Sequence, residues 1–303
     1  MRRKRSFVIM SLLCVFCTAG CQSTNKDAVW TVKMLPKSCR NRLSLQSKTM
    51  YVDFDEKVAW TLRNIKYMGD EIVGVHGYNG SVASAKLRKE DAHCRWIGSG
   101  HGGETVKSFL IFVDGKQTQC EPEAEFSGRE VVLRKQSNLG PLDHKAEIIF
   151  PPSEDYIIEK HSYKVLEDLN DNFNYCYVFM HCSNNSLDQW LVLLAEGKEL
   201  EGVTDKSDGS FQLASDIKAI IFYSQAMKKG VAYVYPEVYK GAGTFKNSIW
   251  DRKNDNKLYF RADVETMGRK VGDTVEYRLK VIPFSAEPDE WKEKGKREAQ
   301  KEF

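Results

Sequence analysis

Short runs of alternating apolar and polar residues fill most of this chain. Residues 49–54, 108–113 and 274–281 are examples, rich in β-branched or aromatic side chains and bounded by turn-forming residues. Further runs of the same kind are 130–133, 146–150, 175–180, 219–223, 231–235 and 257–260. Such runs, about 10–20 residues apart with few helical segments between them, predict a mainly β fold, an antiparallel β-sandwich or barrel.

Few segments interrupt this pattern. Residues 187–196 fit either a helix or a strand, and the Lys- and Glu-rich residues 290–303 predict a charged terminal helix or a frayed tail. Two Asp-Gly pairs, at residues 114–115 and 208–209, are typical of tight hairpin turns.

The candidate boundary inside the chain is Pro151-Pro152-Ser153. We interpret it as a loop within one large sandwich, with two domains as the alternative. The sequence therefore predicts a single β-sandwich domain over residues 28–285 and a charged tail or helix over residues 286–303.

The first residues have the order of a secretory signal. Residues 2–5 are basic, residues 7–16 are apolar, and a segment of small residues ends at Cys21. The apolar run is shorter than the roughly 20 residues of a membrane-spanning helix, which favours a cleaved signal peptide over residues 1–20.

Cys21 follows an Ala-Gly pair, and in this respect the leader resembles a bacterial lipoprotein signal, although Thr18 stands where that family usually has Leu. The resemblance implies a lipid on Cys21, a short tether over residues 21–27 and a place in the bacterial cell envelope. Gln22 is compatible, in that family, with sorting to the outer membrane. The protein body could lie on either the periplasmic or the surface side of that membrane.

The net charge of the chain argues against a nucleic-acid partner. The 45 Lys and Arg and 42 Asp and Glu give a net charge of +3, and removal of the four basic residues of the leader leaves about −1. Nucleic-acid binding needs a clustered basic surface, so we expect no nucleic-acid partner.

The cysteines that follow Cys21 allow at most two disulfides, since they are five in number: Cys39, Cys94, Cys120, Cys176 and Cys182. No C-x-x-C pair remains among them, which argues against a zinc ribbon or a thioredoxin-like site. We expect each to be a buried, unreactive thiol.

Candidate chemistry gathers between residues 74 and 104, which hold half of the six histidines. Four glycines within residues 98–103 require a tight turn, so side chains there should point outward. Imidazole, carboxylate, guanidinium and aromatic rings together suit a sugar site. The candidates are His76, Tyr78, His93, Arg95, Trp96, His101 and Glu104.

Three interpretations of this cluster stay open. It is a structural loop, an acid–base site, or a metal site with His93, His101 and Glu104 as ligands. The spacing matches no standard zinc motif, so no metal is predicted, and the glycines lack the Gly-Lys-Ser/Thr ending of a nucleotide loop. The cofactor, if there is one, stays unknown from the sequence.

A second cluster comprises residues 159–163 and 172–181. On one strand, Tyr175, Tyr177 and Phe179 should share a face, with His181 at the strand end. We interpret it as an ordinary aromatic core with a hydrogen-bonded histidine, and residues 233–239 in the same way.

A mainly β envelope protein with His, Glu, Arg and Trp gathered in one loop resembles the galactose-mutarotase-type β-super-sandwich, over residues 28–285. The resemblance implies sugar chemistry by a histidine and a carboxylate, or by a His/Tyr pair with an Arg. The residues of matching type are His76, Tyr78, His93, Arg95, His101 and Glu104.

We therefore expect a lipid-anchored sandwich that binds or acts on carbohydrate. His101 and Glu104 would transfer protons, with His93 and His76 as further catalytic candidates, and a saccharide would lie on Tyr78, Arg95 and Trp96. Epimerase, lyase and hydrolase activities all stay open, as does the absence of activity. The alternatives are a non-enzymatic envelope lipoprotein with a structural or partner-binding role, and a metal-dependent hydrolase.

Overall fold

A computed structural model describes residues 29–39, 42–74, 79–152, 156–213, 216–240, 247–268 and 270–301. The leader with Cys21 lies outside these residues, as do His76 and Tyr78. Within the described ranges, no helix has the length and apolar character needed to cross a membrane.

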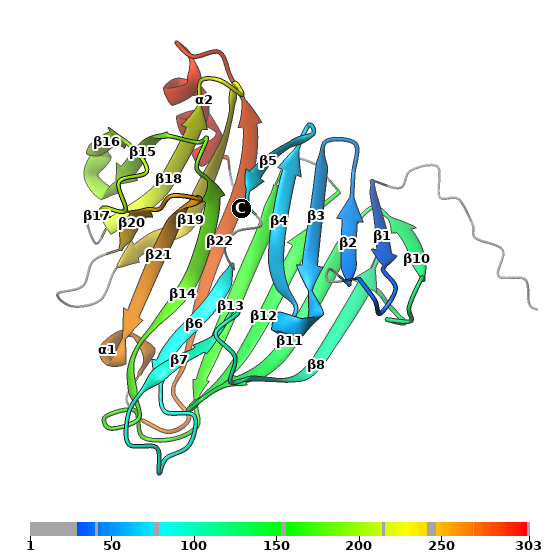
Figure 1. Ribbon diagram of the computed structural model, residues 1–303, viewed down its shortest axis with the longest axis vertical. Coiled ribbons are helices and arrows are strands. Elements are labelled where there is room, and N and C mark those ends of the chain that lie inside the picture. Colours follow the sequence, from blue (N-terminus) through cyan, green and yellow to red (C-terminus); the bar gives the residue numbers. More distant parts are fainter. Residues whose placement is uncertain are drawn as a thin grey trace, which may run out of the picture.

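Two antiparallel sheets lie face to face (Figure 1). The first, sheet A, has the strand order β10 (Glu125–Gly128), β1 (Trp30–Met34), β2 (Leu43–Gln46), β3 (Met50–Asp55), β4 (Thr61–Tyr67), β5 (Asp70–Val73), β14 (Phe173–Asn184), β21 (Asp255–Asp263), β20 (Ser248–Asp251) and β17 (Ser210–Gln212). A further pair branches from β14, namely β6 (Gly80–Ala85) and β7 (Arg95–Gly98).

The second, sheet B, has the order β16 (Glu199–Val203), β15 (Gln189–Leu194), β18 (Asp216–Ser224), β19 (Lys229–Lys240), β22 (Thr274–Ser285), β13 (Ile157–Val165), β12 (Leu142–Phe150), β11 (Val131–Leu139), β8 (Glu104–Val113) and β9 (Lys116–Thr118). The predicted antiparallel β-sandwich is confirmed.

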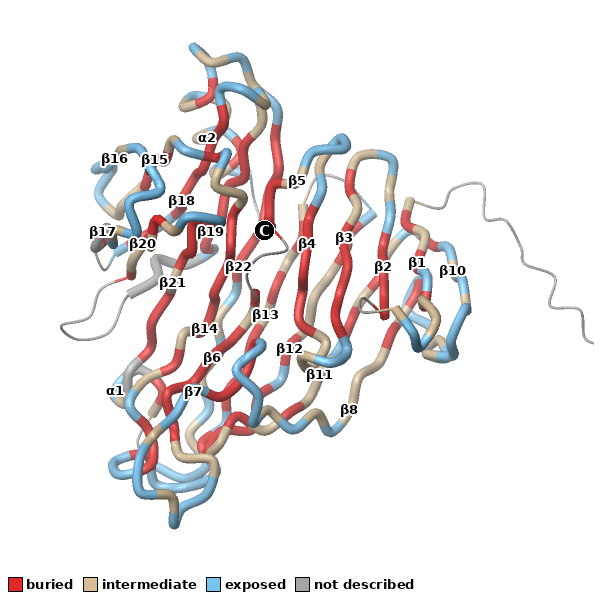
Figure 2. Tube along the Cα trace, in the orientation of Figure 1, coloured by how far each residue is buried: buried red, intermediate tan, exposed pale blue. Residues whose placement is uncertain are grey.

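The main core lies between the sheets, where the inward faces of the strands are buried (Figure 2). Trp30 of sheet A meets Phe150 of sheet B edge to face, with ring centroids 5.1 Å apart, and Phe54 lies 6.4 Å from the same ring. Each such ring stabilises the fold by about 1.5–3 kcal/mol through the apolar surface it removes from water. The alternation seen in the sequence is thus the signature of strands with one buried face.

The helical elements are short: η1 (Glu56–Val58), η2 (Ala195–Gly197), α1 (Val264–Met267) and α2 (Trp291–Ala299). Helix α2 covers the outer face of sheet B, where Trp291 stacks on Tyr223 at 5.1 Å. Gly295 makes this approach possible, because a Cβ there would lie 2.9 Å from Ile221. The predicted terminal helix is confirmed over residues 291–299.

The structure resolves the ambiguous segment 187–196, and the two Asp-Gly pairs have different outcomes. The ambiguous segment 187–196 contains a strand, β15, and the first Asp-Gly pair joins β8 to β9 as a hairpin. The second pair precedes β17 but joins no hairpin, because β16 pairs in sheet B and β17 in sheet A. The prediction of a hairpin at residues 208–209 is wrong, because β17 pairs with the later strand β20 and not with β16.

The cysteines after the leader are all free thiols. Cys176 and Cys182 are buried as expected, whereas Cys39, Cys94 and Cys120 are half-buried. Burial raises the pKa of the Cys176 thiol far above its usual range, which makes it an unreactive core residue.

Candidate functional site

A β-bulge in β14 decides which side chains form the candidate site. Opposite β21 the register shifts between Tyr177 and Phe179, so Val178 is an extra residue. Tyr177 faces solvent and stacks on Trp96, whereas Phe179 is fully buried between the sheets. The prediction that Tyr175, Tyr177 and Phe179 share a face is wrong for Phe179, because one inserted residue reverses every later side chain.

A groove of about 520 Å³ lies on the outer face of sheet A. Aromatic rings from four strands form its floor: Trp96 of β7, Tyr177 of β14, Tyr259 of β21 and Trp250 of β20. Trp96 lies 5.6 Å from Tyr177, Tyr177 lies 4.3 Å from Tyr259, and Tyr259 lies 6.5 Å from Trp250. The small side chains of β6, between β7 and β14, leave room for the Trp96 ring.

Arginine and lysine side chains lie over the faces of aromatic rings in the groove and beside it. The Arg252 guanidinium lies 5.0 Å from the centroid of Trp250, the Lys257 ammonium 5.5 Å from Tyr259, and the Arg261 guanidinium 3.5 Å from Tyr175. Each distance fits a cation–π contact. None of the described residues that line the groove is a carboxylate.

The groove includes two of the residues that the sequence singled out. His101 lies beside Trp96, with ring centroids 5.9 Å apart, and both line the groove. Burial lowers the pKa of His101, and the nearby Lys257 charge lowers it further, so the ring is neutral near pH 7. His93 and Arg95 are exposed and lie outside the lining.

Glu104 lies elsewhere, because the turn over residues 98–103 separates it from His101. Gly98 has φ of +101°, and a Cβ there would lie 2.6 Å from the Ser81 carbonyl oxygen. The chain leaves this turn into β8 of sheet B, and the Glu104 side chain enters the space between the sheets with 3% exposure. His101 and Glu104 therefore do not form the acid–base pair that their spacing suggested.

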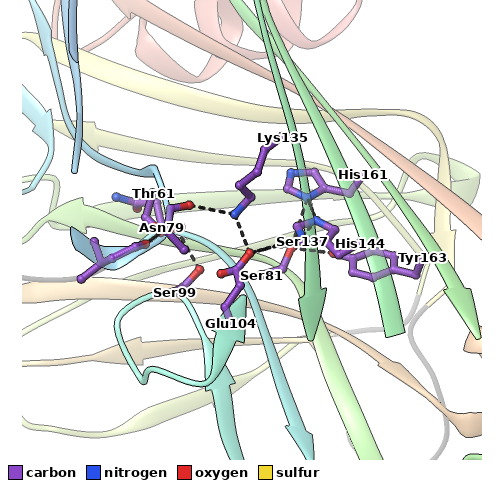
Figure 3. A network of polar contacts seen from close by, with 12 residues as sticks. Thr61, Asn79, Ser81, Ser99, Glu104, Lys135, Ser137, His144, His161 and Tyr163 are labelled. Atoms are coloured by element: carbon purple, nitrogen blue, oxygen red, sulfur yellow. Dashed lines mark hydrogen bonds and ion pairs between the residues drawn. The ribbon is translucent and has the colours of Figure 1, made fainter. Parts of the chain in front are cut away.

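Glu104 belongs to a buried set of polar side chains, the inner network (Figure 3). The Lys135 ammonium donates to Glu104 Oε1 at 2.7 Å, and Ser137 Oγ donates to the same oxygen at 2.6 Å. Burial alone would raise the pKa of Glu104, but Lys135, aided by His144, lowers it to about 2. Glu104 is therefore ionised near pH 7, and Lys135 is its counter-ion.

Histidines continue the inner network across sheet B. His144 Nδ1 lies 3.8 Å from Glu104, and its Nε2 lies 2.9 Å from His161 Nδ1. Beyond it, Glu159 lies between His161, at 3.4 Å, and His181, at 3.5 Å. Burial lowers the pKa of His144 to about 4, so this ring is neutral. The inner network thus comprises Glu104, Lys135, Ser137, His144, Glu159, His161 and His181, together with Ser81 and Tyr163.

The inner network also supports the bulge. Ser81 Oγ and Tyr163 OH each donate to the carbonyl oxygen of Val178 at 3.1 Å, which satisfies the backbone group that the extra residue turns inward. The expectation of a hydrogen-bonded histidine at the strand end is wrong for His181, because neither of its ring nitrogens has a hydrogen-bond partner among the described residues. His161, in the same cluster, is hydrogen-bonded to His144.

Neither a ligand nor a metal fits this interior. The cavity beside Lys135, His144 and His161 measures about 30 Å³, which is room for one water molecule. Over the described residues, no three His, Cys, Asp or Glu side chains are arranged to hold a metal ion. The proposed ligand set of His93, His101 and Glu104 is not assembled.

The alternation rule could have found two groove residues that the sequence interpretation missed. Lys257 and Tyr259 are two apart on one strand, so they share a face. Trp250 gave no such signal, because the pairing of β20 with β21, which sets it opposite Lys257, brings it to the groove, and Arg252 follows directly after β20.

No protein-family model matches the chain, and neither does any curated protein. Among solved structures, a putative aldose 1-epimerase from Klebsiella pneumoniae matches 86% of this chain and 83% of its own, with a TM-score of 0.51 and 9% identity. A galactose mutarotase-like protein from Lactobacillus casei matches 80% of this chain and 99% of its own, with a TM-score of 0.47 and 11% identity. The chain shares its overall fold with the putative aldose 1-epimerase, in agreement with the architectural resemblance predicted from the sequence.

Proposed function

We propose that the groove on sheet A binds a saccharide. The observation that carries this proposal is the continuous row of rings from Trp96 through Tyr177 and Tyr259 to Trp250. The C–H face of a pyranose is apolar and packs on such rings, while its hydroxyls need polar partners at the rim. The volume of about 520 Å³ lies within the range of typical ligand sites.

Binding without chemical turnover fits the groove better than catalysis does. Proton transfer needs a partner for His101, but Glu104 is buried with Lys135 on the far side of the turn. Burial raises the pKa of Tyr177 and Tyr259 far above its usual range, so neither tyrosine supplies a base near neutral pH. The described lining offers no other carboxylate. A neutral imidazole beside an aromatic floor can still exchange hydrogen bonds with sugar hydroxyls.

We further propose that the protein is a lipoprotein of the bacterial cell envelope. The order of the leader supports this, since a lipid on Cys21 would tether the sandwich without using either of its faces. The groove would then remain open to saccharides of the envelope or its surroundings.

Titration with a panel of oligosaccharides tests the proposal, with tryptophan fluorescence and melting temperature as readouts. We expect one sugar class to raise the melting temperature, and Trp96→Ala to weaken its binding at least tenfold, which is about 1.4 kcal/mol. Trp96→Phe, which keeps a ring in place, should retain most of the affinity. A panel without any binder, or equal binding by Trp96→Ala, would overturn the proposal.

A further inference from the structure

Lys257 stands apart from the other groove residues because most of its side chain is covered, yet no acidic side chain among the described residues pairs with its ammonium. The residue is only 8% exposed, yet it lines the groove from β21. Among the described residues, neither a hydrogen bond nor an ion pair reaches its ammonium, which lies over the face of Tyr259 and near the His101 ring. An ammonium that faces a groove without a carboxylate beside it is available to form a charge-assisted hydrogen bond with an anion.

The acidic groups nearest in sequence have other partners. Asp255 is buried and lies 3.4 Å from the Arg252 guanidinium. The Asp251 carboxylate accepts the backbone N–H groups of Asp205, at 2.8 Å, and Lys206, at 3.0 Å. Neither carboxylate is among the residues that line the groove, so the groove presents an excess of positive charge.

Lys135 provides an internal reference for this comparison. Its side chain is similarly covered, at 12% exposure, but its ammonium contacts Glu104 at 2.7 Å. Among the described residues, the fold thus pairs Lys135 with a carboxylate between the sheets and gives Lys257 no carboxylate in the groove on sheet A. A bound anion at Lys257 would make the same charge-assisted hydrogen bond that Glu104 makes at Lys135.

We infer that the groove selects saccharides that carry an anionic substituent, and that Lys257 is the residue that recognises it. This inference rests on the proposed saccharide-binding function and specifies its ligand class. The aromatic row holds the sugar face, while Lys257, with Arg252 at the rim, meets a carboxylate, sulfate or phosphate. A neutral sugar would stack equally well but would leave the ammonium unpaired.

Matched pairs of probes that differ only in charge test the inference on the full chain. Oligogalacturonides against their methyl esters test a carboxylate, dextran sulfate against dextran a sulfate, and glucose 6-phosphate against glucose a phosphate. We expect at least one charged probe to bind tenfold or more tightly than its neutral counterpart, and this preference to shrink at high salt.

Variants assign the preference to one residue. Lys257→Met should bring the charged probe to the affinity of the neutral one, and Lys257→Arg should keep most of the preference. Lys116→Met, which alters an exposed lysine of sheet B, should behave as wild type. The salt dependence of the wild-type protein tests the inference even if a Lys257 variant fails to fold.

These measurements distinguish a loss of anion selectivity from a loss of saccharide binding. Equal affinity for charged and neutral partners would overturn the anion selectivity and leave saccharide binding intact. Binding of inorganic phosphate or sulfate as tight as that of the sugars would also overturn it, since the groove would then be a simple anion site. Absence of binding by every sugar would overturn the function itself.

Discussion

The inner network and the groove use the same kinds of side chain for different ends. In the inner network, Glu104 has Lys135, and the Val178 carbonyl has Ser81 and Tyr163. In the groove, the Lys257 ammonium lies over the face of Tyr259 and pairs with no carboxylate among the described residues, and Trp96 keeps 39% of its surface exposed. Most polar groups of the inner network pair with one another, the exceptions among the described residues being Glu159 Oε1 and the ring nitrogens of His181. Such pairing stabilises a fold, whereas a groove that leaves a lysine and aromatic rings open is suited to a ligand.

The two regions are mechanically linked through β14. The same bulge turns Tyr177 toward the groove and Phe179 toward the core, and the inner network holds its carbonyl. Ser81 and Tyr163 of the inner network therefore help to fix the backbone that carries Tyr177.

The largest expected effect separates the two lysines. Lys135→Met removes the cation of a buried carboxylate, and we expect it to lower the free energy of unfolding by about 3–5 kcal/mol. Lys257→Met leaves no group unpaired, so it should be neutral or slightly stabilising. Urea unfolding of both variants measures the difference. Similar losses from the two would mean that Lys257 has a structural partner and that the contrast is false.

The next effect concerns pH. The folded pKa of His144, about 4, is below its ordinary 6.5, so the unfolded chain binds a proton that the folded chain refuses. Stability should therefore fall as the pH drops from about 6.5 to 4, by roughly 3 kcal/mol. Glu104 acts at lower pH: its folded pKa is depressed from 4.5 to about 2, so its contribution is complete above 4.5 and lost toward 2.

Unfolding free energies measured between pH 3 and 7 check this prediction. His144→Gln should flatten the decline between pH 6.5 and 4, whereas His93→Gln, at an exposed position, should leave it unchanged. A curve that responds to His93 instead would place the acid sensitivity outside the inner network.

How far the sequence could predict these regions follows from the range of the interactions. Alternation predicted the sandwich, and the glycine-rich turn brought Trp96 and His101 into one loop, because both are local signals. The extra residue at Val178 has no local signature, and it reversed the expected position of Phe179. Spacing placed Glu104 beside His101, but a turn that leads into the other sheet separates them, and only tertiary pairing determines that outcome.

The smallest effect tests which side of β7 carries the site. The neutral His101 ring lies beside Trp96 and can exchange one hydrogen bond with a sugar hydroxyl, worth about 0.5–1.5 kcal/mol. We expect His101→Ala to weaken saccharide binding about 3–10-fold with little change in stability, as measured by fluorescence titration and melting temperature. Arg95→Ala should change neither, because Arg95 is exposed and does not line the groove. A larger loss from Arg95→Ala than from His101→Ala would move the site to the opposite face of the strand and break the contrast between an open groove and a closed interior.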